Sequence, residues 1–196
     1  MIRNVDTNSC PEETSKDFYT CKMKNMDIME NDMVYTERFY SMRVPEIKKV
    51  IGTDGIEREI NEQCICDVNN LVRKMVADYK YSPIDLNDMI TVLQSGNSAV
   101  VVEVESGGLD RAERALTMLA ERFELADCPL EQVKELILHI QFTAEDFRLT
   151  LEEQNTIEET LFQHVARDIS LLMGFTDDGT GNEDTLTVTA IAIFQS

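Results

Sequence analysis

Two aspartates near the middle of the chain have a spacing that could support hydrolytic chemistry. Asp85 and Asp88 lie in the segment SPIDLND, residues 82–88. Two nearby carboxylates can orient and polarise a water molecule when a phosphate or a metal ion is brought close. The same residues also suit the start of a helix, because Asp is favoured at the N-cap and in the first turn. The spacing alone favours helix capping, so a catalytic role requires a phosphate supplied from elsewhere.

Other residues with chemical potential are isolated. His139 and His164 are the only histidines, and no Asp, Ser or Cys is spaced to form a triad with either. Cys64 and Cys66 form a C-x-C pair without the second pair that a zinc site needs. The acidic segment DDGTGNED, residues 177–184, lacks the spacing of a calcium loop and is typical of a solvated hairpin turn. We therefore assign no metal.

The chain also lacks the pattern of a phosphate-binding loop. Its only glycines before residue 96 are Gly52 and Gly55, and no Walker-type lysine follows a glycine-rich run. Such loops hold phosphates with backbone N–H groups. We expect no cofactor and no complete nucleotide-binding or catalytic site.

The two aspartates are expected to lie between two helices. Apolar residues at helical spacing predict a long helix over residues 60–80, and Pro83 ends it. A second helix should begin after Asp85 and end before Gly96. The pattern is weaker towards the N-terminus, where residues 34–40 favour a strand and residues 45–50 the start of a short helix.

The second half of the chain alternates strands and helices. Strands are predicted over residues 100–105, 135–142, 170–176 and 185–194, and helices over 109–123 and 150–167. Thr150 and Glu153 form a capping box at the start of the second of these helices. The order β-α-β-α-β-β predicts an α/β fold with a four-stranded mixed sheet covered by helices and preceded by the long helix. We expect two regions, an N-terminal arm over 1–59 and this domain over 60–196.

Composition limits the classes of partner. The chain has 37 acidic and 18 basic residues and a net charge of −19, which disfavours nucleic acid and anionic membranes. It has no apolar run of membrane-spanning length and no signal peptide, so we expect a cytoplasmic protein without membrane insertion. Five cysteines without framework spacing fit reduced thiols.

Several segments, taken together, resemble the C-terminal domain of the FtsZ/tubulin family. PIDLNDMITVL, residues 83–93, resembles the family's synergy loop, N-(V/L)-D-F-A-D-V-x-T-V-M, with Asp85 and Asp88 at matching positions. Pro83 and Asn87 stand where the family has Asn and a small residue. Further segments match in order and cover, with the loop, roughly the last 135 residues: SGGLDRA (106–112), LILHI (136–140), LTLEEQNTIEE (149–159), MGF (173–175) and VTAIA (188–192).

The resemblance implies a filament partner. In that family the loop of one subunit reaches the GTP of the next, and its aspartates help to activate the attacking water. This resemblance implies that the chain docks on a complete FtsZ/tubulin-like GTPase and caps or modulates its filaments in cell division, with Asp85 and Asp88 acting only in trans. Self-association is a further expectation. The docking residues would be Pro83, Ile84, Asp85, Leu86, Asn87 and Asp88.

Two other functions stay open. A small-molecule-binding or regulatory domain could reuse the same fold, and its mark would be an apolar pocket with a few converging polar groups. An independent hydrolase would need a substrate-phosphate site beside the aspartates. For the docking function, Arg111, Arg114 and Arg122 could form a basic patch on one helix, or an ordinary solvated face.

Overall fold

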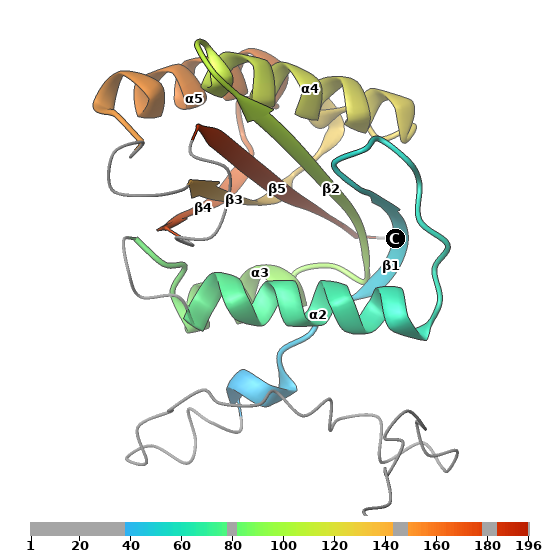
Figure 1. Cartoon of the computed structure of the whole chain (residues 1–196). Helices are drawn as coiled ribbons and strands as arrows, with labels where there is room; N and C mark the ends of the chain where they lie inside the picture. The colour runs from blue at the N-terminus through green and yellow to red at the C-terminus, as the bar shows by residue number, and fades with distance from the viewer. Residues whose placement is uncertain (1–37, 78–81, 143–148, 178–183, 196) are drawn as a thin grey trace, which may run out of the picture. The chain divides into compact units, whose positions relative to one another are not determined.

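The fold combines one mixed sheet with helices on both of its faces (Figure 1). The computed structural model describes residues 38–77, 82–142, 149–177 and 184–195. The chain divides into two units, 1–41 and 42–196, and the second contains the elements that follow. In chain order these are β1 (Glu46–Ile51), α2 (Glu62–Ala77), α3 (Leu86–Gln94), β2 (Ser98–Gly107), α4 (Arg111–Leu125), the 3-10 turn η1 (Leu130–Gln132), β3 (Glu135–Phe142), α5 (Leu151–His164), β4 (Ser170–Asp177) and β5 (Thr185–Phe194).

The sheet has five strands in the order β1-β2-β5-β3-β4, one more than the sequence predicted. β1 runs parallel to β2, and β3 runs parallel to β4. β5 lies between these pairs and is antiparallel to both β2 and β3. Figure 1 shows α4 and α5 on one face of the sheet and α2 and α3 on the other.

The main core lies between the sheet and the pair α4 and α5. Alternate residues of β2 and β3, such as Val102 and Leu138, point into it and are fully buried. Phe123 and Leu161 contribute the helical side. The opposite face of β3 is buried as well, because Ile137 and His139 lie under the other helix layer. Both faces of the central strands are therefore covered.

β1 corrects the prediction of a helix over residues 45–50. Its register with β2 shifts between Ile47 and Lys49, so that Lys48 is an extra, bulged residue. The bulge lets Lys49 reach the C-terminal end of α4, where its Nζ donates to the carbonyl oxygen of Ala126 at 2.8 Å. β1 belongs to the sheet, so it lies in the same compact unit, 42–196, as the elements that follow it.

The last two strands are not a hairpin. β4 and β5 follow each other in the chain, but β3 lies between them in the sheet. The prediction of a hairpin turn over 177–184 is therefore wrong, although residues 178–183 lie outside the described residues. The predicted strand over 34–40 is also wrong where it can be compared, since residues 38–40 are helical and 34–37 are not described.

The helices confirm the periodicity and capping arguments. α2 buries Val68, Val72, Met75 and Val76 as one stripe. Thr150 and Glu153 form the expected capping box of α5. Among the described residues, no helix is long and apolar enough to cross a bilayer.

Candidate docking loop

The segment 82–88 is held on two sides by the fold. The backbone N–H of Ser82 donates to the carbonyl oxygen of Phe175 at 3.0 Å, and the Phe175 N–H donates back at 2.8 Å. Two residues later, the N–H of Ile84 donates to the carbonyl oxygen of Met75 on α2 at 3.4 Å. The loop is thus tied to β4 and to α2 before α3 begins.

Gly174 on β4 allows this close approach. A Cβ atom at position 174 would lie 2.5 Å from Cγ1 of Ile84, a distance that no side chain tolerates without movement. Ile84 itself is 2% exposed. The loop therefore rests on the sheet through a buried isoleucine and a glycine that leaves room for it.

Asp85 acts as the N-cap of α3. Its Oδ1 accepts the N–H of Asn87 at 2.7 Å and the N–H of Asp88 at 3.2 Å, from an extended backbone. This bonding satisfies two of the N–H groups that a helix start leaves unpaired. Asp88 lies in the first helical turn with an exposed side chain, where a negative charge also favours the helix dipole. The capping interpretation of Asp85 is thereby confirmed.

The six residues predicted for docking divide into two groups. Ile84 and Leu86 are each 2% exposed, so they support the loop from inside. Asp85, Asn87 and Asp88 are exposed, and Pro83 is half-buried. The spacing of Leu86 from Met89 and Leu93 at i, i+3 and i+7 could have indicated its burial from the sequence.

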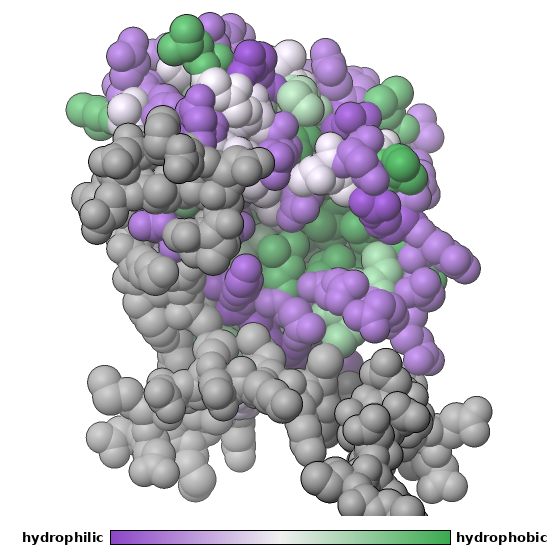
Figure 2. Space-filling model, in the orientation of Figure 1, coloured by the Kyte–Doolittle hydropathy of each residue, from purple (hydrophilic) through white to green (hydrophobic). Residues whose placement is uncertain are grey.

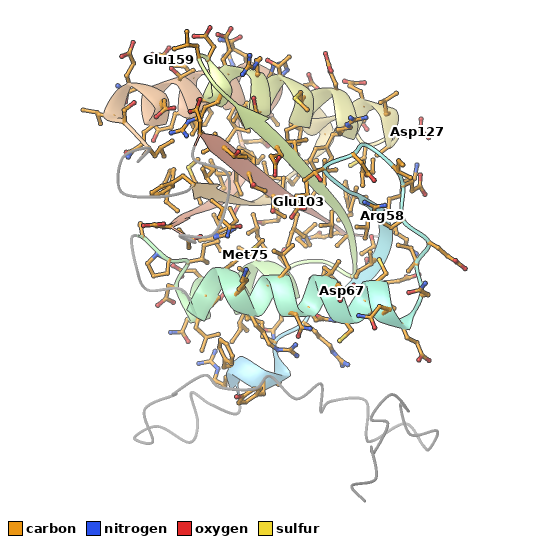
Figure 3. All side chains as sticks on the ribbon, in the orientation of Figure 1. Arg58, Asp67, Met75, Glu103, Asp127 and Glu159 are labelled. Carbon is orange, nitrogen blue, oxygen red and sulfur yellow. The ribbon has the colours of Figure 1, made fainter. Side chains whose placement is uncertain are left out.

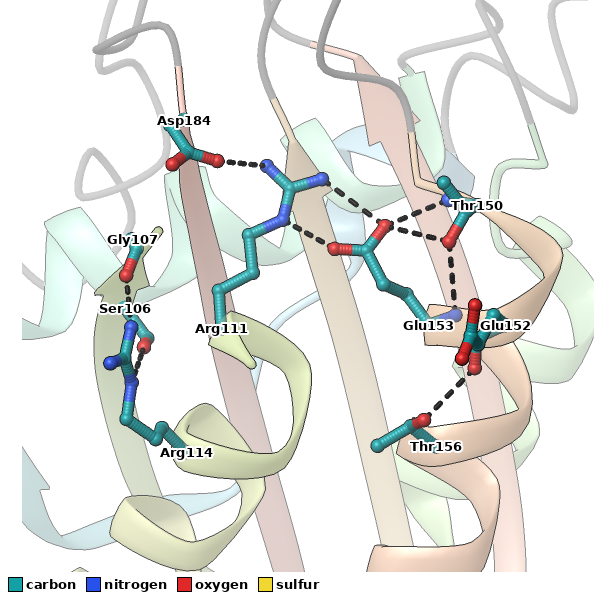
Figure 4. A network of polar contacts seen from close by, with 9 residues as sticks. All are labelled: Ser106, Gly107, Arg111, Arg114, Thr150, Glu152, Glu153, Thr156 and Asp184. Carbon is teal, nitrogen blue, oxygen red and sulfur yellow. Dashed lines mark hydrogen bonds and ion pairs between the residues drawn. The ribbon is translucent and has the colours of Figure 1, made fainter. Parts of the chain in front are cut away.

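A buried ion pair joins the start of α4 to the start of α5 (Figure 4). It lies at the same end of the sheet as the loop 82–88. Arg111 is 4% exposed, and its Nε donates to Oε1 of Glu153 at 2.6 Å. Its Nη1 lies 3.6 Å from Oδ1 of Asp184, at the start of β5. Burial alone would raise the pKa of Glu153, but hydrogen bonds from Arg111 and Thr150, with the Arg111 charge, outweigh it and lower the pKa.

The three arginines considered as a basic patch differ in their contacts. Arg111 is buried in the ion pair just described. Arg114 donates to the carbonyl oxygen of Gly107 and to the hydroxyl of Ser106, at the end of β2. The guanidinium of Arg122 lies directly over Gly55. Arg111 and Arg114 therefore form bonds within the fold, and the association patch on α4 stays a prediction.

His139 is a deeply buried titratable side chain. Its ring is 4% exposed, and its Nε2 lies 3.0 Å from the hydroxyl of Thr176. Burial, followed by the charge of Lys74, lowers its pKa from 6.5 to about 4, so the ring is neutral at pH 7. Within the described residues, no group of three or more His, Cys, Asp or Glu side chains could hold a metal ion.

A groove opens between α2 and the β1–β2 edge of the sheet. It has a volume of about 550 Å³. Figure 2 shows apolar side chains at its floor and hydrophilic ones at its border. In Figure 3, Glu103 extends from the sheet, Asp67 from α2 and Arg58 from the segment that joins β1 to α2. The sequence pattern does not reveal this groove, because residues 45–50, which contribute to β1 and one wall of the groove, predict the start of a helix.

The mixed five-stranded sheet flanked by helices defines an α/β protein with the FtsZ/tubulin fold. A solved structure of the FtsZ W319Y mutant from M. jannaschii is similar to 68% of this chain, with a TM-score of 0.56 and 22% identity. An empty FtsZ dimer from M. jannaschii is similar to 70% of the chain, with a TM-score of 0.51 and 20% identity.

These similarities show the fold alone. The matched part is only 39% and 40% of the two FtsZ chains, so this chain spans about two fifths of their length. No family model matches the sequence, and no curated protein matches it. The expected likeness to part of FtsZ is confirmed at the level of structure.

Proposed function

We propose that this chain docks through residues 82–88 on the GTP-bearing face of a complete FtsZ/tubulin-like GTPase and caps or modulates its filaments. The proposal is supported by the FtsZ-like fold, together with a loop at the start of α3 whose sequence resembles the synergy loop of that family. In this proposal the chain presents one of the two longitudinal surfaces of a filament subunit. A subunit bound in that way ends growth at one end and does not extend it.

The anchoring of the loop supports docking without a large rearrangement. Backbone bonds to Phe175 and Met75 fix the loop before any partner binds. Asp85 then orients the N–H groups of Asn87 and Asp88 at the helix start. A surface that is already ordered loses less conformational entropy on binding than a flexible one.

The exposed carboxylates set the chemistry of the contact. Asp88 can orient a water molecule towards a phosphate that the partner supplies, while Asp85 holds the loop with one of its two oxygens. Any contribution to hydrolysis would therefore act in trans. Ile84 and Leu86 would contribute through the position of the loop and not through contact.

The test combines polymer mass with GTP turnover. The purified chain is mixed with a complete FtsZ from the same cell and GTP, and light scattering and phosphate release are recorded together. Asp88→Ala removes the exposed carboxylate, and Glu121→Ala removes an equally exposed carboxylate from α4 as the matched control. We expect substoichiometric amounts of the wild-type chain to change at least one trace, and Asp88→Ala to alter that effect while Glu121→Ala does not.

The direction of the change separates the mechanisms. Lower polymer mass with unchanged turnover per polymer indicates a cap, and higher phosphate release indicates activation in trans. If neither trace changes and sedimentation detects no binding, the docking proposal is wrong. Equal effects of both variants would place the contact away from the loop.

A second candidate function is the binding of a small regulatory molecule. The observation that favours it is the groove between α2, β1 and β2, which combines apolar and polar side chains. Its volume of about 550 Å³ falls within the usual range for ligand pockets. The groove and the loop have no residue in common, so the two functions can be tested separately.

A further inference from the structure

We propose that the groove between α2 and the β1–β2 edge binds a small molecule with an apolar body and a protonated amine. This inference names the ligand class for the second candidate function and rests on it. It does not depend on docking of the loop, because none of the groove residues lies in 82–88.

The floor of the groove provides an apolar contact surface. Val68 and Val101 are buried, while Val50 and Leu71 are half-buried and face the same space. These residues come from β1, β2 and α2, so three elements fix the floor. A ligand with an aromatic or branched body would remove the remaining apolar surface from water, which favours binding.

The border of the groove has an excess of negative charge. Three carboxylates, of Glu59, Asp67 and Glu103, line it against one guanidinium, of Arg58. Arg58 is already paired with Asp54 at 2.9 Å, which offsets its charge. A cation is therefore attracted to the groove and an anion is repelled, and the interaction is strongest where part of the water has been displaced.

Glu103 is the carboxylate best placed to fix the amine. It lies on β2, is half-buried, and its Oε2 accepts the hydroxyl of Thr189 at 3.2 Å. That bond orients the carboxylate on a rigid strand, whereas Asp67 faces the groove from α2. Cys64 lines the same groove. The pKa of its half-buried thiol is raised, first by burial and then by the charge of Asp67.

Three probes with the same body and different charge test the ligand class. They are 1-naphthylmethylamine, 1-naphthylmethanol and 1-naphthylacetate, titrated into the full chain at pH 7 with naphthyl fluorescence as the readout. We expect the amine to bind about tenfold more tightly than the acetate, as for one partly screened charge pair. The alcohol should fall between them.

Protection of a thiol locates the bound probe. Cys64 lines the groove, so bound amine should slow its alkylation by iodoacetamide, measured by mass spectrometry. Cys66, which is also half-buried on α2, does not line the groove and serves as the internal reference. Glu103→Gln keeps the shape and removes the charge, and it should lower the affinity for the amine several-fold, whereas Glu121→Gln on α4 should leave it unchanged.

Different failures overturn different statements. If all three probes bind equally and protect Cys64, the groove is a ligand site but the preference for an amine is refuted. If none binds and the alkylation rate is unchanged, both the ligand class and the second candidate function are refuted. Binding of the amine that Glu103→Gln does not weaken would also refute the proposed role of this carboxylate.

Discussion

Replacing His139 should remove a defined part of the pH dependence of stability. The imidazole lies on β3 between the sheet and the second helix layer, and burial, with the charge of Lys74, lowers its pKa from 6.5 to about 4. In the unfolded chain the ring returns to its ordinary pKa. Between pH 6.5 and pH 4 the unfolded state therefore binds more protons than the folded state, and the free energy of unfolding falls as the pH falls.

The size of the effect follows from the difference in pKa. One pKa unit corresponds to about 1.4 kcal/mol, so the 2.5 units between 6.5 and 4 correspond to roughly 3 kcal/mol once the pH is below 4. At pH 5 His139 is protonated only in the unfolded state, and its contribution lowers the free energy of unfolding by about 2 kcal/mol relative to pH 7. The lowered pKa of Glu153 acts at lower pH, because stability from that carboxylate is lost only as the pH falls through its folded pKa, below 4.5.

Urea unfolding of three chains at pH 7 and pH 5 measures this contribution. His139→Gln cannot be protonated, so its change between the two pH values should be smaller than that of the wild type by about 2 kcal/mol. His164→Gln, at the partly exposed end of α5, is the matched control for replacing a histidine by glutamine. An equal pH dependence for wild type and His139→Gln would refute the reasoning. If His139→Gln does not fold, an NMR titration of the wild-type ring provides the test, and titration near pH 6.5 would contradict it.

Three further substitutions test the packing around the loop and the ion pair. Asp85→Ala removes the N-cap of α3 and should lower the free energy of unfolding by about 1 kcal/mol in urea unfolding; an unchanged value would show that the cap contributes nothing. Gly174→Ala places a Cβ 2.5 Å from Cγ1 of Ile84 and should cost roughly 1–3 kcal/mol. Ile84→Ala removes that Cγ1, so the cost of Gly174→Ala should be smaller in the Ile84→Ala background; an equal cost in both backgrounds would place the strain elsewhere. Arg111→Met leaves the Glu153 carboxylate without its main partner and should cost about 3 kcal/mol, with a raised pKa of Glu153 by NMR; an unshifted pKa would argue against the pair.

Local signals predicted the helices and their starts. The apolar stripe of α2, the N-cap of α3 and the capping box of α5 each depend on residues within a few positions of one another. β3 was also predicted with its observed bounds, from the alternation of Leu136, Leu138 and Ile140. These predictions agree with the structure because the apolar residues of each pattern are the ones that pack into the core.

The two errors in the sheet have physical causes. The sequence EIKKVI of β1 does not alternate, because the bulge at Lys48 changes which face the following residues point to. The order of β4 and β5 depends on pairing between strands that are distant in the chain: β5 pairs with β2, and Val101 lies opposite Ile191. Nothing in the sequence between β4 and β5 indicates that β3 lies between them.

The site was predicted in part for the same reasons. Asp85 as an N-cap follows from its position before an apolar periodic segment. The role of Arg111 depends on Glu153, 42 residues later, and no local pattern indicates that contact. The groove requires β1 in the sheet, so it could not be predicted once residues 45–50 were assigned to a helix.

The charge of the exposed loop constrains any partner that it contacts. Asp85, Asn87 and Asp88 form the exposed part, and the chain as a whole has a net charge of −19. Two carboxylates brought towards a bare nucleotide phosphate would meet repulsion at short range. Docking therefore requires positive charge on the partner, from basic side chains or from a metal ion bound to the phosphate. Since screening weakens such contacts, docking should be weaker at high salt.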